Sequence, residues 1–271
     1  MYYAMDEIGR DNCQIMRSLS DAGDKWRLID ELAQQAGFFG IHVSKDRYEK
    51  DYLLPLATIP EEMRRYRLTI HLDRPYSLVE DDECRRVWHW LDSALSFAKS
   101  VNAKSVSICP PSIPTGMQPM RGYLRERFLE VISAISGEYR WTGVGLSIRS
   151  DTMGREALFQ GLADYVDFIN EVRIGALVDL SSLFYQGYSV NDLLEALDRT
   201  TVAGFYVSDA FPGKDAAEGM RLPVGDGLMG LERILAKYAR RDDVFGALSV
   251  DANFEEIRES LRKVMAFRHD I

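Results

Sequence analysis

The chain has 271 residues, of which 46% are hydrophobic and 28% are charged, and its formal net charge is −9. This composition is that of a folded globular protein long enough to bury a core without disulfide staples. The acidic balance argues against a nucleic-acid partner, because nucleic-acid binding needs a clustered basic face.

The cysteines and the first residues indicate a cytoplasmic protein. Cys13, Cys84 and Cys109 form an odd, widely spaced set without a C-x-x-C pair, which is typical of reduced thiols rather than of a disulfide frame or a zinc knuckle. The start, M-Y-Y-A-M-D-E-I-G-R-D, lacks the basic and apolar regions of a signal peptide. No run approaches the roughly 18 apolar residues of a membrane span, so we expect no membrane partner.

Short apolar runs recur along the chain and predict eight strands. They are nearly continuously apolar, which is typical of parallel strands covered by helices. The runs are residues 2–8, 38–44, 67–72, 104–109, 143–148, 174–180, 202–207 and 246–250.

Between these runs, apolar residues recur at the i, i+3/i+4 spacing of helices, most clearly in residues 84–101, 124–135 and 257–265. Eight strand–helix units of about 34 residues each match the repeating unit of a (β/α)₈ barrel. We therefore predict an α/β fold, a single TIM barrel domain over residues 1–271, with a doubly wound open sheet as the rival. Residues 9–23 form a long polar segment that the pattern does not place.

Polar residues stand where the predicted strands end, which in such a barrel is the side that carries the active site. They are His42, His71, Cys109, Arg149, Asp179, Tyr206, Asp209 and Asp251. A strand histidine is more often a hydrogen-bonded core residue than a catalytic one, and Tyr206 can be core. Asp179 and Asp251 are harder to explain in this way, because an unpaired buried carboxylate is costly. They need a cation between them, either a metal ion or Arg149, which ends the strand G-V-G-L-S-I-R.

Several motifs in order along the chain resemble the xylose isomerase-like TIM barrels, which include sugar isomerases, sugar epimerases and the endonuclease IV group (AP endonuclease family 2). The motifs are Q-A-G-F-F-G-I-H, R-L-T-I-H-L, G-A-L-V-D-L, G-F-Y-V-S-D-A, L-P-V-G-D-G and G-A-L-S-V-D-A-N. The resemblance spans nearly the whole chain. It implies a carbohydrate-like ligand and, in the usual member, a divalent metal ion.

Members of this family typically hold that metal with Glu, Asp, His and Glu from strands five to eight. The resemblance places Arg149, Asp179, Tyr206 and Asp251 at these positions, so only one ligand is kept unchanged and one is a shorter carboxylate. Further departures are Cys109 and Ser182 where the family has histidines, whereas His71 in strand three is retained. The resemblance therefore implies a degenerate metal site.

Arg149 offers a physical substitute for the metal. Replacing Glu by Arg changes the local charge by the charge of a divalent ion, and a guanidinium pairs well with carboxylates. We predict that Arg149 takes the place of the metal and pairs with Asp179 and Asp251, and we expect no metal ligands and no cofactor. Bound Mn²⁺, Zn²⁺ or Mg²⁺ is the less favoured alternative, because a fixed cation opposes a second one.

The segment 209–221, D-A-F-P-G-K-D-A-A-E-G-M-R, is long enough to cover the mouth of the barrel. Its Lys214 and Arg221 can meet a phosphate or carboxylate, so we count them, with His42 and Asp209, as candidate substrate-binding residues. The motif G-D-G-L-M-G (225–230) matches G-x-G-x-x-G but lacks the strand–turn–helix context of a dinucleotide site. It predicts a tight turn and a helix N-terminus.

Two functions from different classes fit these residues. The first is a sugar isomerase or epimerase with metal-independent chemistry, in which Asp179, Asp251 or His71 is the base and Arg149 or Tyr206 stabilises the enolate. The second is a non-catalytic binding or regulatory barrel. A metal-dependent sugar isomerase and a DNA-repair endonuclease are less favoured, since the latter needs several metals and a basic crescent. In each favoured case the partner is a small, polyhydroxylated, anionic metabolite, and a homo-oligomer is compatible with the sequence.

Overall fold

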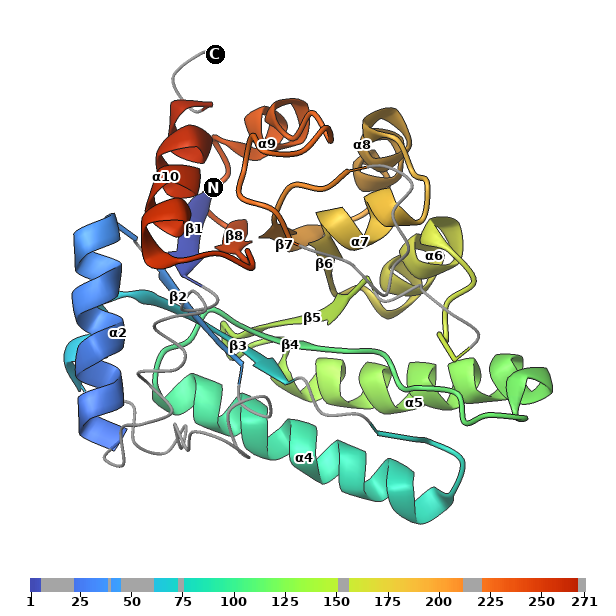
Figure 1. The fold of residues 1–271 in the computed structure, drawn as a ribbon. Coiled ribbons are helices and arrows are strands. Elements are labelled where there is room, and N and C mark those ends of the chain that lie inside the picture. Colours follow the sequence, from blue (N-terminus) through green and yellow to red (C-terminus); the bar gives the residue numbers. More distant parts are fainter. Residues whose placement is uncertain are drawn as a thin grey trace.

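The strands form a closed parallel barrel in the order of the chain, β1 to β8, with β1 beside β8 (Figure 1). The computed structural model describes residues 1–5, 22–38, 40–44, 61–72, 76–150, 156–211 and 221–267. The strands are β1 Tyr2–Met5, β2 Gly40–Ser44, β3 Arg67–Leu72, β4 Ser105–Ile108, β5 Gly145–Arg149, β6 Gly175–Asp179, β7 Val202–Val207 and β8 Phe245–Leu248.

All eight predicted strands are confirmed, and the open-sheet alternative is wrong, because Tyr2 to Met5 pair with Phe245 to Leu248 and close the barrel. Most ends differ from the prediction by one or two residues. Two of these ends matter for the site. β5 extends to Arg149, and β8 stops at Leu248, so the chain from Ser249 to Asp251 has already left the sheet.

Helices surround the barrel (Figure 1). They are α2 Ala22–Ala36, α4 Asp81–Ser100, α5 Arg121–Tyr139, α6 Leu162–Val172, α7 Leu180–Tyr185, α8 Val190–Asp198, α9 Glu232–Tyr238 and α10 Phe254–Ala266, with short 3₁₀ turns η2 Glu61–Arg65 and η3 Gln118–Met120. The helical periodicity predicts the buried face correctly in α4, where Val87, Leu91 and Leu95 are buried. None of the helices in the described parts of the chain is long and apolar enough to cross a membrane.

The barrel interior is polar on one side and apolar on the other. Side chains of β3 to β5 bring in buried hydroxyl groups, those of Thr69, Ser105, Ser107 and Ser147. The β6 to β8 side is an apolar cluster of Leu177, Tyr206, Phe245 and Ala247. Residue 204 has to be a glycine, because a Cβ there would lie 2.5 Å from the Phe245 ring.

Much of the chain between β1, β2, β3, β5 or β7 and the next described element lies outside the described residues. These parts are residues 6–21, 45–60, 73–75, 151–155 and 212–220, and they include Lys214 and most of the unplaced segment 9–23. The structure therefore describes the mouth of the barrel at the level of the strand ends.

Candidate active site at the mouth of the barrel

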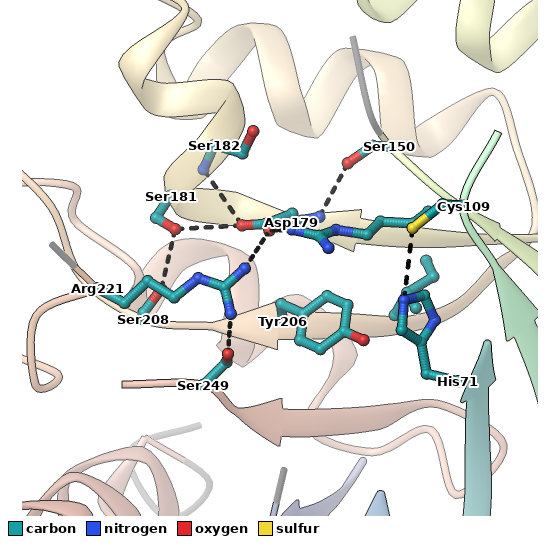
Figure 2. Close-up of polar contacts among 12 residues, drawn as sticks. His71, Cys109, Ser150, Asp179, Ser181, Ser182, Tyr206, Ser208, Arg221 and Ser249 are labelled. Carbon is teal, nitrogen blue, oxygen red and sulfur yellow. Dashed lines mark hydrogen bonds and ion pairs between the residues drawn. The ribbon is translucent and has the colours of Figure 1, made fainter. Parts of the chain in front are cut away.

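Asp179 lies at the centre of a charged cluster (Figure 2). It ends β6 and is also the N-cap of α7, so Oδ1 accepts hydrogen bonds from Ser182 N (3.2 Å) and Ser181 Oγ (3.1 Å). Oδ2 accepts from Nη2 of Arg149 (2.7 Å) and Nη2 of Arg221 (3.0 Å). Both oxygens of this carboxylate, which is only 1% exposed, are thus fully engaged.

The two arginines keep this carboxylate ionised. Burial alone would raise the pKa of Asp179, but the charges of Arg221 and Arg149 outweigh burial and lower it. Burial likewise opposes the charge of Arg149, yet the nearby Asp179 holds the pKa of Arg149 well above its usual value. Two guanidinium groups therefore share one carboxylate, and the buried cluster carries a surplus of positive charge.

Both guanidinium groups also lie over the ring of Tyr206. Arg149 Cζ is 5.1 Å from the ring centroid and Arg221 Cζ is 5.5 Å from it, distances at which the ring face attracts a cation. Arg221 additionally donates through Nη1 to Ser249 Oγ. These contacts fix both arginines at the strand ends while leaving their side chains 23% and 20% exposed.

A second group of residues, on β2 to β4, is held by neutral hydrogen bonds. Both ring nitrogens of His42 are engaged, Nδ1 with Thr69 Oγ1 (2.7 Å) and Nε2 with Tyr206 Oη (2.9 Å). His71 contacts Ser107 Oγ through Nδ1 at 2.9 Å, and the Cys109 thiol lies 3.6 Å from its Nε2 (Figure 2). Tyr206 joins this group to the charged cluster, because its ring packs on His71 at 5.7 Å between centroids.

His71 is a neutral imidazole in this setting. Burial is the largest influence, and the neighbouring His42, Arg149 and Arg221 act in the same direction, so the pKa of His71 lies well below its usual value. It is consequently a hydrogen-bond acceptor rather than a cation at neutral pH.

The structure brings together Arg149, Asp179, Tyr206, His42 and His71, all of which the sequence placed at the mouth. It adds Arg221, predicted as a residue of the covering segment, as the second cationic partner of Asp179.

Asp251 differs from the expected geometry. It was predicted to pair with Arg149, but because β8 ends before it, its carboxylate is exposed and accepts from the backbone N–H of Arg221 (3.2 Å). Among the described contacts, the ion pair of Arg149 is with Asp179 alone.

Asp209, which the sequence predicts to bind substrate, forms hydrogen bonds to the backbone of its own chain. Its carboxylate accepts from the backbone N–H groups of Ala210 (2.9 Å), Gly225 (3.0 Å) and Met229 (3.2 Å), and it is 4% exposed. It thus organises the turn of the G-D-G-L-M-G motif. Lys214 lies outside the described residues, so its expected role is not tested.

Serines supply most of the supporting contacts that the sequence reading did not single out. Ser150 accepts from Asp179 N (2.9 Å), Ser208 donates to Ser181 (2.9 Å), and Ser249 accepts from Arg221. Ser150, Ser208 and Ser249 directly follow strand ends. A serine one or two residues before an aspartate at such a position is the signal that could have pointed to them.

At the opposite end of the barrel, a cavity of about 430 Å³ lies where β5 and β6 begin, lined by residues that include Tyr139, Arg140, Asn170 and Arg173. Catalytic sites of (β/α)₈ barrels form at the C-terminal ends of the strands. The charged cluster, rather than this cavity, is therefore the candidate active site.

The chain belongs to the xylose isomerase-like TIM barrel family, whose model matches residues 31–267. No curated protein matches its sequence. Among solved structures, it is similar to a D-tagatose 3-epimerase-like protein, with a TM-score of 0.75 and 15% identity, covering 100% of this chain and 99% of the other.

Two further similar structures contain metal ions. A xylose isomerase-like TIM barrel protein from Mycobacterium smegmatis in complex with magnesium has a TM-score of 0.69 and 16% identity, covering 99% of this chain and 97% of the other. The IolI protein with a bound zinc atom has a TM-score of 0.69 and 15% identity, covering 99% and 98%. At these identities the similarity shows the shared fold.

The residues at the family's metal position do not fit a divalent ion. Arg149 and Tyr206 supply no carboxylate or imidazole at the positions where the sequence resemblance expects ligands, and Asp179 already accepts hydrogen bonds at both oxygens. No group of three or more His, Cys, Asp or Glu side chains within the described ranges is arranged to hold a metal. A divalent cation placed beside the two fixed guanidinium groups would also be repelled.

Proposed function

We propose that this barrel binds a small, polyhydroxylated, anionic metabolite at its mouth and acts on it as an isomerase or epimerase without a metal ion. The main support for this proposal is that two guanidinium groups, those of Arg149 and Arg221, form ion pairs with the one carboxylate of Asp179. This cluster lies at the strand ends, where the family holds its metal. The class of reaction is supported by the family and by structural neighbours such as the D-tagatose 3-epimerase-like protein.

The cluster favours an anion because its charge is unbalanced. A guanidinium has several N–H donors, and in Arg149 the bond to Asp179 is made through Nη2. The partial exposure of Arg149 and Arg221 leaves room for a ligand carboxylate or phosphate to accept from them. Asp251 is exposed to solvent, which screens its charge.

The residues divide the work of a proton transfer next to a carbonyl group. Arg149 and Tyr206 are placed to stabilise the negative charge that develops on the carbonyl oxygen. Asp179 is a poor base, because four hydrogen bonds hold its carboxylate and its pKa is lowered. His71, neutral and with Nε2 turned toward the mouth, is the better base.

The four hydrogen bonds to the carboxylate of Asp179 leave it without a free lone pair for catalysis, which also supports the second candidate, a non-catalytic binding or regulatory barrel. The two functions separate on turnover, since a binder shows saturable association without product. Incubation with D-tagatose, D-fructose 6-phosphate or D-gluconate, followed by NMR of the sugar carbons, distinguishes them.

The substitution of the metal by Arg149 is tested with elemental analysis and thermal shift in Mn²⁺, Zn²⁺, Mg²⁺ and Co²⁺. We expect the wild-type protein to be metal-free and its Tm to be unmoved, whereas Arg149→Glu gains a metal-dependent rise. Arg149→Gln is the matched control, because it removes the cation without supplying a carboxylate. Near-stoichiometric metal in the wild-type protein would overturn the proposal.

Anion binding is tested with the same thermal-shift measurement. A ligand present at about 100 times its Kd stabilises the folded state by about 2.7 kcal/mol, which raises Tm by about 5–10 °C in a chain of this size. D-Fructose 6-phosphate or D-gluconate should produce such a shift, and neutral D-tagatose a smaller one. Equal shifts for charged and neutral sugars, or their persistence in Arg221→Gln, would contradict the role of the cluster.

A further inference from the structure

The Cys109 thiol faces the imidazole of His71 at the edge of the mouth (Figure 2). Cys109 follows β4 directly and is partly exposed, and its Sγ lies 3.6 Å from His71 Nε2. Its backbone is fixed from the other side, because the hydroxyl of Tyr76 donates to the Cys109 carbonyl at 2.6 Å. A thiol within hydrogen-bond reach of a histidine has the arrangement of an activated nucleophile and its base.

The hydrogen bonds of Ser107 determine which nitrogen of His71 carries the proton. The Ser107 hydroxyl donates to the Ile70 carbonyl (3.2 Å), so its oxygen accepts from Nδ1–H of His71 (2.9 Å). The lone pair of the neutral ring is then on Nε2, which points at the Cys109 thiol. A third residue thus orients the base toward the thiol, as in the triads of other enzymes.

The charged cluster lies beside this pair and favours a negative charge on the sulfur. Burial is the largest influence on the pKa of Arg149 and lowers it. Asp179 raises this pKa most, and Cys109 is the next group that raises it. The interaction is mutual, so the guanidinium stabilises a thiolate at Cys109.

We propose that Cys109 and His71 form the acid–base pair that moves the substrate proton in this site, with Ser107 as the positioning residue. The inference rests on the proposed function and names the groups that carry out its chemistry. The sequence placed Cys109 at the mouth without a catalytic role and offered His71, Asp179 or Asp251 as the base.

The proton transfers balance without a co-reactant. Nε2 of His71 takes the Sγ proton of Cys109 while Sγ takes a proton from the substrate carbon next to the carbonyl. The electrons of that C–H bond form the C=C bond of an enolate, whose oxygen takes the negative charge and pairs with Arg149. In the second half Sγ–H returns its proton to carbon, and Nε2 returns its proton to Sγ, so both groups end as they began.

Cys84 provides an internal comparison on the outside of the barrel. It lies on α4 against α5, and its sulfur accepts from Nε (3.3 Å) and Nη2 (3.0 Å) of Arg127. It therefore has a cation beside it, as Cys109 does, but its described contacts include no histidine.

The first test needs no substrate. In a Cys13→Ser background, iodoacetamide labelling is followed by mass spectrometry of the two remaining thiols between pH 5 and 9. Cys109 should react about tenfold or more faster than Cys84 at pH 7, because the thiolate is the reacting form. His71→Asn should remove this advantage and leave Cys84 unchanged. Ser107→Ala, checked by its thermal melt, should shift the pH profile of Cys109 alone.

The proposal is overturned if Cys109 reacts no faster than Cys84, or if neither His71→Asn nor Ser107→Ala changes its rate. Ser107→Ala keeps the test decisive should His71→Asn fail to fold.

The second test separates this proposal from the proposed function. In D₂O, the wild-type protein should exchange deuterium into D-fructose 6-phosphate at the carbon next to the carbonyl, and Cys109→Ser should lose about 100-fold or more of this rate while its thermal shift with the sugar phosphate remains. Cys84→Ser should exchange as the wild type does. Undiminished exchange in Cys109→Ser would refute the role of the thiol and leave the proposed function standing. Absence of both exchange and thermal shift in the wild type would refute the proposed function, and the thiol proposal with it.

Discussion

The two halves of the barrel mouth are built on different physical principles. On the β5 to β8 side, Arg149, Asp179 and Arg221 are ionised and neutralise one another in part. On the β2 to β4 side, His42, His71 and their hydroxyl partners are held by hydrogen bonds, and His71 is kept neutral. A charged half suits recognition of an anion and of developing negative charge, whereas a neutral half with an available lone pair suits proton transfer.

Tyr206 belongs to both halves. Its ring face lies against the two guanidinium groups, and its hydroxyl contacts Nε2 of His42. The charged half in turn holds the neutral half in its state, since Arg149 and Arg221 contribute to the lowered pKa of His71. One half is therefore held by ion pairs and the other by hydrogen bonds, but the charges of the first half influence the protonation of the second.

Asp179→Asn should have the largest effect, because it leaves two guanidinium groups facing each other without a carboxylate. Breaking a buried ion pair on one side costs about 3–5 kcal/mol, and the partial exposure of the arginines places this case near the lower end. Urea denaturation at pH 7 measures the free energy of unfolding.

Asp167→Asn is the matched control, since it breaks an exposed ion pair with Arg199, at 3.1 Å, and should cost less than about 1 kcal/mol. If Asp179→Asn costs no more than this control, the charged half is not held together by its carboxylate.

Acid should weaken the neutral half first. The folded-state pKa of His71 lies below that of an unfolded histidine, about 6.5, so the unfolded chain takes up the proton first as the pH falls. Stability is full above about pH 6.5 and declines below it by at most about 1.4 kcal/mol per pH unit. Asp179, whose pKa is lowered, loses its contribution only when the pH falls below its usual value of 3.8.

Urea denaturation at several pH values measures this decline, and His71→Asn should flatten the curve between pH 5 and 6.5. An unchanged slope in that variant would show that another group titrates there.

The sequence predicts the barrel and much of the charged half because both depend on strand ends. Apolar runs fix the strands, parallel strands in a closed barrel bring their ends together, and Arg149 therefore meets Asp179. Asp251 could not be placed in the same way, because β8 stops at Leu248 and the direction of the chain beyond a strand is not written in its periodicity.

The neutral half depends on details that the sequence does not carry. The role of Cys109 requires the tautomer of His71 that carries its proton on Nδ1. This tautomer is set by the hydroxyl of Ser107, which lies on β4 two residues before Cys109. The binding of Asp209 to Gly225 and Met229 likewise depends on a chain segment folding back on a strand end. Such contacts depend on how distant segments of the chain are placed relative to one another and not on residue type alone.

Tyr206→Phe should have the smallest effect and tests whether the halves are separable. The variant loses the hydroxyl that contacts His42 at 2.9 Å but keeps the ring under Arg149 and Arg221. Loss of one such hydrogen bond costs about 1 kcal/mol, whereas the thermal shift with D-fructose 6-phosphate should persist. Tyr165→Phe is the matched control. Tyr165 lies on helix α6 outside the barrel, and the variant likewise removes one buried hydroxyl, which donates to the Ile148 carbonyl (2.7 Å).

A second variant, Tyr206→Leu, removes the ring as well and should weaken the thermal shift with the sugar phosphate, since the cation–ring contacts that align the arginines are lost. If Tyr206→Phe abolishes the shift as fully as Tyr206→Leu, the hydroxyl rather than the ring aligns the arginines, and the mouth is a single hydrogen-bonded unit instead of two halves.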